Sequence, residues 1–211
     1  MTTALVLFAR APRAGEVKTR LIPTLGAVGA ADLYRDLLAH ALALARAAPV
    51  TTRYLYAVDT AARDAFSAAP AAGGFELAVQ ADGDLGARMR NACAAALRTH
   101  AAVLLMGADL VDSTVADLAL AARWLAEDAE VVLGPVADGG YWLIGLREAR
   151  ADVFDAMPWG TASVYAQTVV RLAATLTPWR ALPLRHDIDE ARDLAVHAEA
   201  IANLRSRREG R

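Results

Sequence analysis

The sequence predicts an α/β fold in which helices cover both faces of a mixed, mainly parallel sheet of about seven strands. Short apolar runs alternate with longer segments of helical apolar spacing along nearly the whole chain, as in a three-layer, Rossmann-like α/β/α architecture. The apolar runs lack a regular polar–apolar alternation, as expected for strands covered on both faces. Hydrophobic residues make up 56% of the 211 residues, which is enough for a core and excludes a mainly disordered chain.

The expected strands are short runs rich in β-branched and large apolar residues. The run Thr3–Ala9 (TALVLFA) carries no charge and is expected in the interior of the sheet. Two strands, at residues 130–136 and 141–146, are joined by Asp-Gly-Gly with no helix between them, and this direct connection makes the sheet mixed. The full set of expected strands is 3–9, 52–58, 75–79, 102–106, 130–136, 141–146 and 181–184.

The expected helices occupy intervals between these strands. Residues 28–47 have leucines at helical spacing, and Pro49 ends this helix because proline cannot continue one. Ser113 stands where an N-cap would precede another helix, and residues 70–74 form a loop. The full set of expected helices is 28–47, 60–69, 84–100, 113–127, 161–176 and 189–205.

We expect residues 1–205 to form a single domain, followed by a basic tail at residues 206–211 that is a helix end rather than a nucleic-acid site. The net charge of −2 gives no strong attraction to nucleic acid or to an anionic membrane. The sequence shows no bilayer-spanning stretch and no signal-peptide pattern. Cys93 is the only cysteine, which excludes an intrachain disulfide and a cysteine-built metal site. These features indicate a soluble, cytoplasmic protein.

A basic loop follows the first expected strand, at the edge of the sheet where ligands of open α/β folds bind. It contains Arg10, Arg13, Gly15, Lys18 and Arg20. Backbone amides near the glycine and the four cations can neutralise phosphate oxygens, whereas the plain alternative is a solvated basic loop. Lys18 is the only lysine beside 21 arginines, which favours a role that a compact ammonium fills better than a guanidinium. We expect these residues to bind a nucleotide.

Carboxylates follow the fourth expected strand and precede the last expected helix. Asp109 ends a Gly-Ala-Asp sequence, and Asp187 and Asp189 would point the same way in an extended segment. Carboxylate oxygens hold divalent cations over phosphates, whereas the plain alternative is a turn or a helix cap. The sequence therefore predicts a Mg²⁺ or Mn²⁺ site at these three residues. The site can form only if the sheet brings both segments to one rim.

The segment after the third expected strand has two glycines before a helix, which allows a planar ligand or a sugar to approach closely. Asp84 in this segment is better explained as a plain N-cap. We expect Gln80, Gly86 and Arg88 to contact the nucleotide.

The Asp-Gly-Gly turn between the fifth and sixth expected strands is followed by aromatic residues. A bare hairpin turn is the plain explanation. However, aromatic rings near a polar turn are frequent contacts of sugars and bases, and a similar Trp-Gly-Thr segment precedes the next helix. The expected acceptor-binding residues are Asp138, Gly139, Gly140, Tyr141, Trp159 and Thr161.

Six motifs are distributed in order along nearly the whole chain: FARAPRAGEVKTRL, GDLGARM, GAD, GPVADGGYWLIGL, PWGTASVYAQT and DIDEARDL. On these motifs the chain resembles the GT-A-type nucleotide-diphospho-sugar transferases, and above all a bacterial group of radical-SAM/selenodomain-associated transferases. The KTRL loop and the DID…DL ending also resemble phospholactate guanylyltransferases and, more distantly, sugar-nucleotide pyrophosphorylases. One departure is Val111, where the family usually has proline after Gly-Ser-Asp-x.

The resemblance implies an enzyme with a GT-A fold, which transfers a glycosyl group from a nucleotide-diphospho-sugar to an unknown small-molecule acceptor. Asp109 and Lys18 are then catalytic, and Mg²⁺ or Mn²⁺ helps the diphosphate to leave. The basic loop also suits a nucleotidyltransferase that uses a nucleoside triphosphate and releases pyrophosphate. A third alternative is a catalytically inactive nucleotide-binding domain. The sequence indicates no nucleic-acid partner and no oligomeric state.

Overall fold

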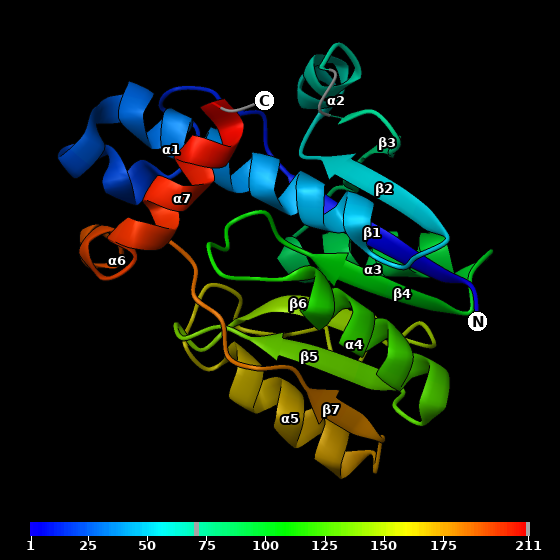
Figure 1. The fold of residues 1–211 in the computed structure, drawn as a ribbon. Helices are drawn as coiled ribbons and strands as arrows, with labels where there is room; N and C mark the ends of the chain where they lie inside the picture. The colour runs from blue at the N-terminus through cyan, green and yellow to red at the C-terminus, as the bar shows by residue number, and fades with distance from the viewer. Residues whose placement is uncertain (70–71, 210–211) are drawn as a thin grey trace.

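Within residues 1–69 and 72–209, which the structure describes, seven strands form one sheet in the order β3-β2-β1-β4-β6-β5-β7 (Figure 1). The structure is a computed structural model. Strand β6 is antiparallel to β4 and β5, and the other neighbouring strands are parallel, which confirms the mixed sheet with β1 in its interior. The strands are β1 (Thr3–Ala9), β2 (Thr52–Ala57), β3 (Glu76–Val79), β4 (Ala102–Met106), β5 (Val131–Pro135), β6 (Tyr141–Leu146) and β7 (Trp179–Ala181).

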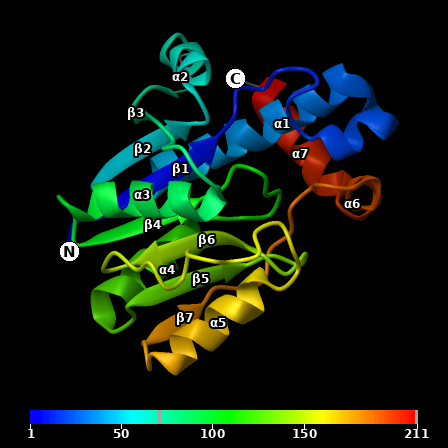
Figure 2. The same cartoon turned by 180° about the vertical axis from the view of Figure 1, so that it is seen from behind.

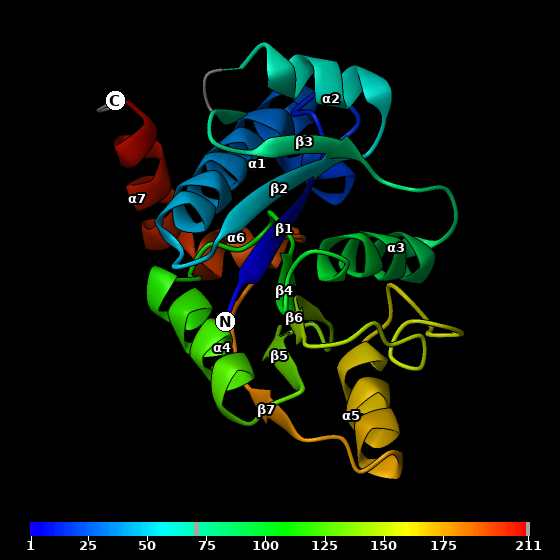
Figure 3. The ribbon, with the colours of Figure 1, turned by 90° about the vertical axis from the view of Figure 1, so that its right-hand side faces the viewer.

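Helices cover both faces of the sheet and complete the three predicted layers (Figures 2 and 3). Helices α1, α2 and α4 pack on one face, and α3 and α5 on the other. Helix α7 lies against α1, at the periphery (Figure 1). The helices are the 3₁₀ turn η1 (Thr19–Leu21), α1 (Ile22–Ala47), α2 (Thr60–Ser67), α3 (Leu85–Leu97), α4 (Val115–Glu127), α5 (Val164–Ala174), α6 (Ala191–Val196) and α7 (Ala198–Glu209).

Helix α1 begins at Ile22 rather than at the predicted Val28. Pro23 is in the first turn, where a backbone N–H has no intrahelical partner to lose. Gly26 has φ 71°, so the helix consists of two pieces joined at a kink. The kink interrupts the apolar spacing, which is why the periodic pattern starts only after it.

Helix α4 is capped by Thr114 and not by the predicted Ser113. The Thr114 hydroxyl accepts a hydrogen bond from the Asp117 N–H, and the Asp117 carboxylate accepts one from the Thr114 N–H. This reciprocal capping box satisfies two backbone donors at once, whereas either residue alone satisfies one.

The C-terminal segment differs from the single helix predicted at residues 189–205. It forms α6 and α7, which are broken at His197, and α7 continues to Glu209 into the predicted tail. No helix in the two described ranges is long and apolar enough to cross a membrane. Residues 70–71 of the predicted loop 70–74 lie outside the described residues.

A small third hydrophobic cluster joins α1, α6 and α7 to loops at the carboxyl edge of the sheet. Its members Leu21, Val111 and Ile188 are at most 5% exposed. Each is within two residues in the chain of a predicted site residue. Because fully burying such a side chain contributes about 1.5–3 kcal/mol, this cluster fixes three loops relative to one another.

Candidate functional site

The strap, which we define as residues 182–190, crosses the carboxyl edge of the sheet between β7 and α6. Its Ile188 N–H donates to the Asp109 carbonyl at 3.4 Å, and the Val111 N–H donates to the His186 carbonyl at 3.3 Å. A proline at position 111, as in the resembled motif, has no N–H for this second bond. The strap is therefore held directly against the loop that follows β4.

The Lys18 ammonium lies between two carboxylates. Its Nζ is 3.3 Å from Asp109 Oδ2 and 3.5 Å from Asp189 Oδ1. Because both oxygens contact the same nitrogen, the two carboxylates lie close to each other. The Lys18 side chain is 3% exposed, and its Nζ makes no hydrogen bond within the described part of the chain. Its backbone is left-handed (φ 47°, ψ 43°), which is uncommon for a residue other than glycine. A buried ammonium with unused donors is suited to the oxygens of an anionic ligand.

Asp187 is partly buried and close to other carboxylates. Burial, and after it the negative charge of Asp138, raises the pKa of Asp187 to about 6, while the Lys18 ammonium opposes this shift. Carboxylates that repel one another are suited to a shared divalent cation. Among the residues described, no three His, Cys, Asp or Glu side chains are placed so that they could hold a metal ion. Phosphate oxygens would therefore have to complete the coordination of an ion there.

A cavity of about 580 Å³ contains most of the predicted site residues. This volume is in the usual range of small-molecule sites, about 300–1,000 Å³. Arg10 and Arg20 reach the cavity from the basic loop, and Arg20 also pairs with Asp189. The predicted residues that line it are Arg10, Lys18, Arg20, Gln80, Arg88, Asp109, Asp138, Gly140, Tyr141, Trp159, Thr161, Asp187 and Asp189.

Three predicted nucleotide-binding residues do not line this cavity. Arg13 pairs with Glu16 at 3.6 Å and lines a smaller neighbouring cavity. Gly15 has φ 85° and faces open space. A Cβ on Gly86 would lie 2.5 Å from Trp159 Nε1, so this glycine makes room for an indole of the same chain. The structure explains Gly86 by packing, and its nucleotide contact stays a prediction.

The Asp-Gly-Gly turn is packed against the loop before α5. Asp138 Oδ1 accepts a hydrogen bond from the Gly140 N–H at 2.8 Å. Gly139, which does not itself line the cavity, has φ 91°, and a Cβ there would lie 2.1 Å from the Ala162 carbonyl oxygen. The Tyr165 N–H also donates to the Gly139 carbonyl at 2.9 Å. The two segments predicted to bind the acceptor are therefore in contact.

Tyr141 and Trp159 form one aromatic wall of the cavity. Their rings meet edge to face with centroids 6.0 Å apart. The Tyr141 hydroxyl and Trp159 Nε1 are buried and have no hydrogen-bond partner among the described residues, and burial raises the pKa of Tyr141. Because these polar atoms are covered, the two side chains offer the cavity the carbon surface of their rings.

The family comparison covers more than half of the chain. Residues 41–161 match the family described as "Uncharacterized protein conserved in bacteria (DUF2064)". The chain belongs to this family. No curated protein gives a significant match to the chain.

Solved structures resemble this DUF2064 chain over nearly its whole length. A candidate nucleotide-diphospho-sugar transferase from Desulfovibrio desulfuricans G20 has a TM-score of 0.84 at 28% identity, covering 97% of this chain and 99% of that one. CMP:2-keto-3-deoxy-manno-octonic acid synthetase complexed with CTP has a TM-score of 0.63 at 11% identity, covering 96% and 99%. Rv0371c from Mycobacterium tuberculosis H37Rv, in a complex with manganese, has a TM-score of 0.59 at 19% identity, covering 94% and 99%.

These similarities confirm the predicted Rossmann-like, GT-A-like fold. The enzymes named among the similar structures include transferases and nucleotidyltransferases, in agreement with the enzyme class that the sequence predicts. The sub-group within the family and the metal dependence remain proposals.

Sequence reasoning missed the arginines that hold the loop bearing Trp159. Arg171 of α5 donates three hydrogen bonds, of 2.6 to 3.0 Å, to backbone carbonyls in residues 152–156. Arg90 of α3 donates to both carboxylate oxygens of Asp155 at 2.7 and 2.8 Å. No spacing rule in a single sequence connects these arginines with that loop, because the contacts depend on the packing of α3 and α5.

We predict that Gly139→Ala destabilises the fold by more than about 1 kcal/mol, because alanine at positive φ is strained and its Cβ would also overlap the Ala162 carbonyl. Urea unfolding measures this loss. Gly74→Ala is the matched control, since Gly74 has φ 85° with open space around its Cβ position. Alanine there is strained by its backbone conformation but overlaps no neighbouring atom. Equal losses in the two variants would contradict the proposed contact.

We also predict that Asp187→Asn raises the melting temperature at about pH 8 in metal-free buffer. The pKa of Asp187 in the folded chain, about 6, exceeds its ordinary value of 3.8, so the folded state loses stability as pH rises through this interval. Asparagine does not ionise and escapes this loss. The gain should vanish below about pH 4, where the aspartate is protonated in both states. The measurement is the melting temperature of the native chain and of Asp187→Asn across pH. A gain in melting temperature that does not depend on pH would contradict the raised pKa of Asp187.

Proposed function

We propose that the chain is a metal-dependent transferase that moves a glycosyl group from a nucleotide-diphospho-sugar to a small-molecule acceptor. The observation that carries this proposal is the buried Lys18 ammonium, which stands at the cavity between Asp109 and Asp189 with unused hydrogen-bond donors. The 28% identical structure, which is named a candidate transferase of this kind, supports the same class. The motifs favour the radical-SAM/selenodomain-associated group. We further propose that residues 1–205 act as one domain in the cytoplasm.

The proposed phosphate site is the basic loop, with Lys18 as the buried donor. Asp109, Asp187 and Asp189 would hold Mg²⁺ or Mn²⁺, and their hard carboxylate oxygens fit such an ion. The ion supplies positive charge to the leaving diphosphate when it is bound. The manganese in the structure of Rv0371c is in keeping with this choice, although that protein is only 19% identical. The other proposed nucleotide-binding residues are Arg10, Arg13, Gly15, Arg20, Gln80, Gly86 and Arg88.

The chain's own part in the reaction is to fix the donor and to exclude water. Lys18 and the neighbouring arginines would hold the phosphate oxygens, so that negative charge developing on the diphosphate meets donors already in place. The aromatic wall of Tyr141 and Trp159 would cover the sugar or the acceptor. The full proposed acceptor site is Asp138, Gly139, Gly140, Tyr141, Trp159 and Thr161.

A nucleotidyltransferase is the second candidate, and the number of cations favours it. Arg10, Lys18, Arg20 and Arg88 line one cavity, and a nucleoside triphosphate carries more negative charge than a sugar diphosphate. The resemblance of the KTRL loop to phospholactate guanylyltransferases and the synthetase complexed with CTP support this alternative. In this reaction an anionic acceptor attacks the α-phosphorus and pyrophosphate leaves.

A thermal-shift panel of nucleotides and nucleotide-sugars, with and without Mg²⁺ or Mn²⁺, tests the proposal. A ligand at one hundred times its dissociation constant adds about 2.7 kcal/mol of stability. Turnover with the best ligand then identifies the reaction, because glycosyl transfer releases a nucleoside diphosphate and nucleotidyl transfer releases pyrophosphate. Tight binding without either product would mean that the chain is an inactive nucleotide-binding domain. No stabilisation by any nucleotide would overturn all three alternatives.

We expect Lys18→Met to weaken nucleotide binding by roughly 1.5–3 kcal/mol, the usual contribution of a hydrogen bond to a charged group. Methionine keeps an apolar stem of similar length and removes the ammonium. Isothermal titration with the nucleotide selected by the panel measures the loss. Arg123→Met is the control, since this arginine pairs with Glu127 on the surface of α4 and does not line the cavity. An unchanged affinity in the Lys18 variant would remove the basic loop from the phosphate site.

We expect Asp109→Asn to abolish metal-dependent product release while leaving much of the metal-free nucleotide affinity, because the amide is a weaker ligand for a hard cation. Product release and metal-free titration are measured on the same preparation. Asp128→Asn removes an acid that pairs with Arg180 outside the cavity, and it should leave both quantities unchanged. Normal turnover in the Asp109 variant would show that this carboxylate is structural.

A further inference from the structure

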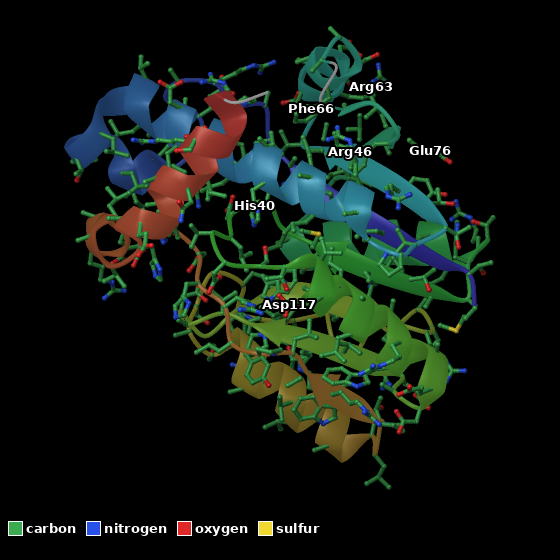
Figure 4. The ribbon with its side chains drawn as sticks, in the orientation of Figure 1. His40, Arg46, Arg63, Phe66, Glu76 and Asp117 are labelled. Carbon is green, nitrogen blue, oxygen red and sulfur yellow. The ribbon has the colours of Figure 1, made fainter. Side chains whose placement is uncertain are left out.

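The strap has a second anchor, an ion pair between Arg185 and Asp117. Arg185 Nη2 donates to Asp117 Oδ1 at 2.6 Å, and the Asp117 side chain is only 5% exposed. Asp117 lies in the first turn of α4 (Figure 4), where its other oxygen accepts from the Thr114 N–H at 2.8 Å. The capping box therefore fixes the orientation of the carboxylate that receives the guanidinium.

The next strap residue is anchored on the loop that carries Asp109. The His186 N–H donates to Asp112 Oδ1 at 3.0 Å, and His186 Nδ1 lies 2.9 Å from Asp112 Oδ2. One carboxylate thus holds both the backbone and the ring of this histidine. The neighbouring residue, Asp187, lines the cavity, as does Asp189 two residues further along the strap.

The side chains of these two pairs do not line the main cavity, so they do not reach a ligand bound there. The pairs are Arg185 with Asp117 and His186 with Asp112. They act on the strap, which has no helical or long strand structure of its own to fix its direction. The strap must nevertheless keep Asp189 beside the Lys18 ammonium that Asp109 also contacts, and Asp187 close to the like charge of Asp138. The two anchors, which lie outside the cavity, supply that constraint.

We propose that Arg185, through Asp117, and His186, through Asp112, are positioning residues that aim the carboxylates of the strap at the cation bound with the phosphates. This inference rests on the proposed function, because it needs a divalent cation at Asp109. Outer residues of this kind orient the ligands of a metal, and their loss typically weakens metal affinity 10- to 100-fold.

Binding of Mn²⁺ in the presence of inorganic pyrophosphate tests the proposal without turnover. Pyrophosphate is the portion common to both candidate nucleotide ligands, and equilibrium dialysis against one Mn²⁺–pyrophosphate solution counts the Mn²⁺ that the protein retains. We expect Arg185→Met to weaken Mn²⁺ binding about tenfold or more, and Arg185→Lys to recover part of the loss because it retains the positive charge. Arg185 is preferred to Asp117 as the changed residue, since Asp117 also caps α4.

Two controls separate positioning from stability. Arg180→Met removes an ion pair of the same 2.6 Å length five residues earlier, outside the cavity, and should leave Mn²⁺ affinity unchanged. Leu172→Ala opens a cavity in the fully buried core under α5, and should lower the melting temperature without changing Mn²⁺ affinity.

The outcomes distinguish the proposed metal site from the positioning role of Arg185. If the native chain binds no Mn²⁺ with pyrophosphate, the proposed metal site itself is wrong, and the positioning role is overturned with it. If the native chain binds and Arg185→Met binds equally well, only the positioning role is overturned. An equal loss in Leu172→Ala would also overturn it, because the loss would then follow stability.

Discussion

The candidate site depends on one constraint, the crossing of the strap over the carboxyl edge of the sheet. Hydrogen bonds between its backbone and the loops after β4 and β5 fix its register, and Ile188 is buried between the two acidic residues that flank it. A shift of one residue would turn Asp187 and Asp189 away from Asp109 and expose the isoleucine. The burial of Ile188 thus sets where the carboxylates of Asp187 and Asp189 lie, although the isoleucine itself does not line the cavity.

Lys18 is the electrostatic counterpart of this crossing. Two carboxylates converge on its Nζ from different parts of the chain, and the backbone at Lys18, whose side chain is buried, is left-handed. An ammonium buried without hydrogen bonds is costly to hold, so it persists only where opposite charges surround it. The third hydrophobic cluster, which includes Leu21, keeps the basic loop in place around it.

The fold was predictable because it follows from patterns that a single sequence displays. Alternating apolar runs and helical segments gave the layers, and the turn before Tyr141 gave the antiparallel strand. The rule that ligands bind beyond the carboxyl ends of strands placed Lys18, Asp109 and Asp187 together. What the sequence did not reveal depends on distant packing. Gly86 faces Trp159, and nothing in the spacing of these two residues says so.

The start of a helix was predictable only where the sequence offered a single capping residue. Asp84 caps α3 as expected, whereas Thr114 prevails over the adjacent Ser113 because only Thr114 can exchange hydrogen bonds with Asp117. The break at His197 accompanies a tilted contact of its ring with the ring of His186, with centroids 4.8 Å apart. The acidic residues of the strap could be named from the sequence, but the groups that hold the strap could not.

The order of the residues along the chain has a consequence for synthesis. Asp109 and the basic loop emerge from the ribosome well before the strap, whose Asp187 follows 78 residues after Asp109. At about 5–20 residues per second, that interval lasts roughly 4–16 seconds. During it the nascent chain can assemble β1 to β4 with their parallel neighbours, while Lys18 and Asp109 lack their opposite wall. A cavity with both walls therefore appears only after the strap has folded back over the carboxyl edge of the sheet, so ligand capture reports that this late segment is in place.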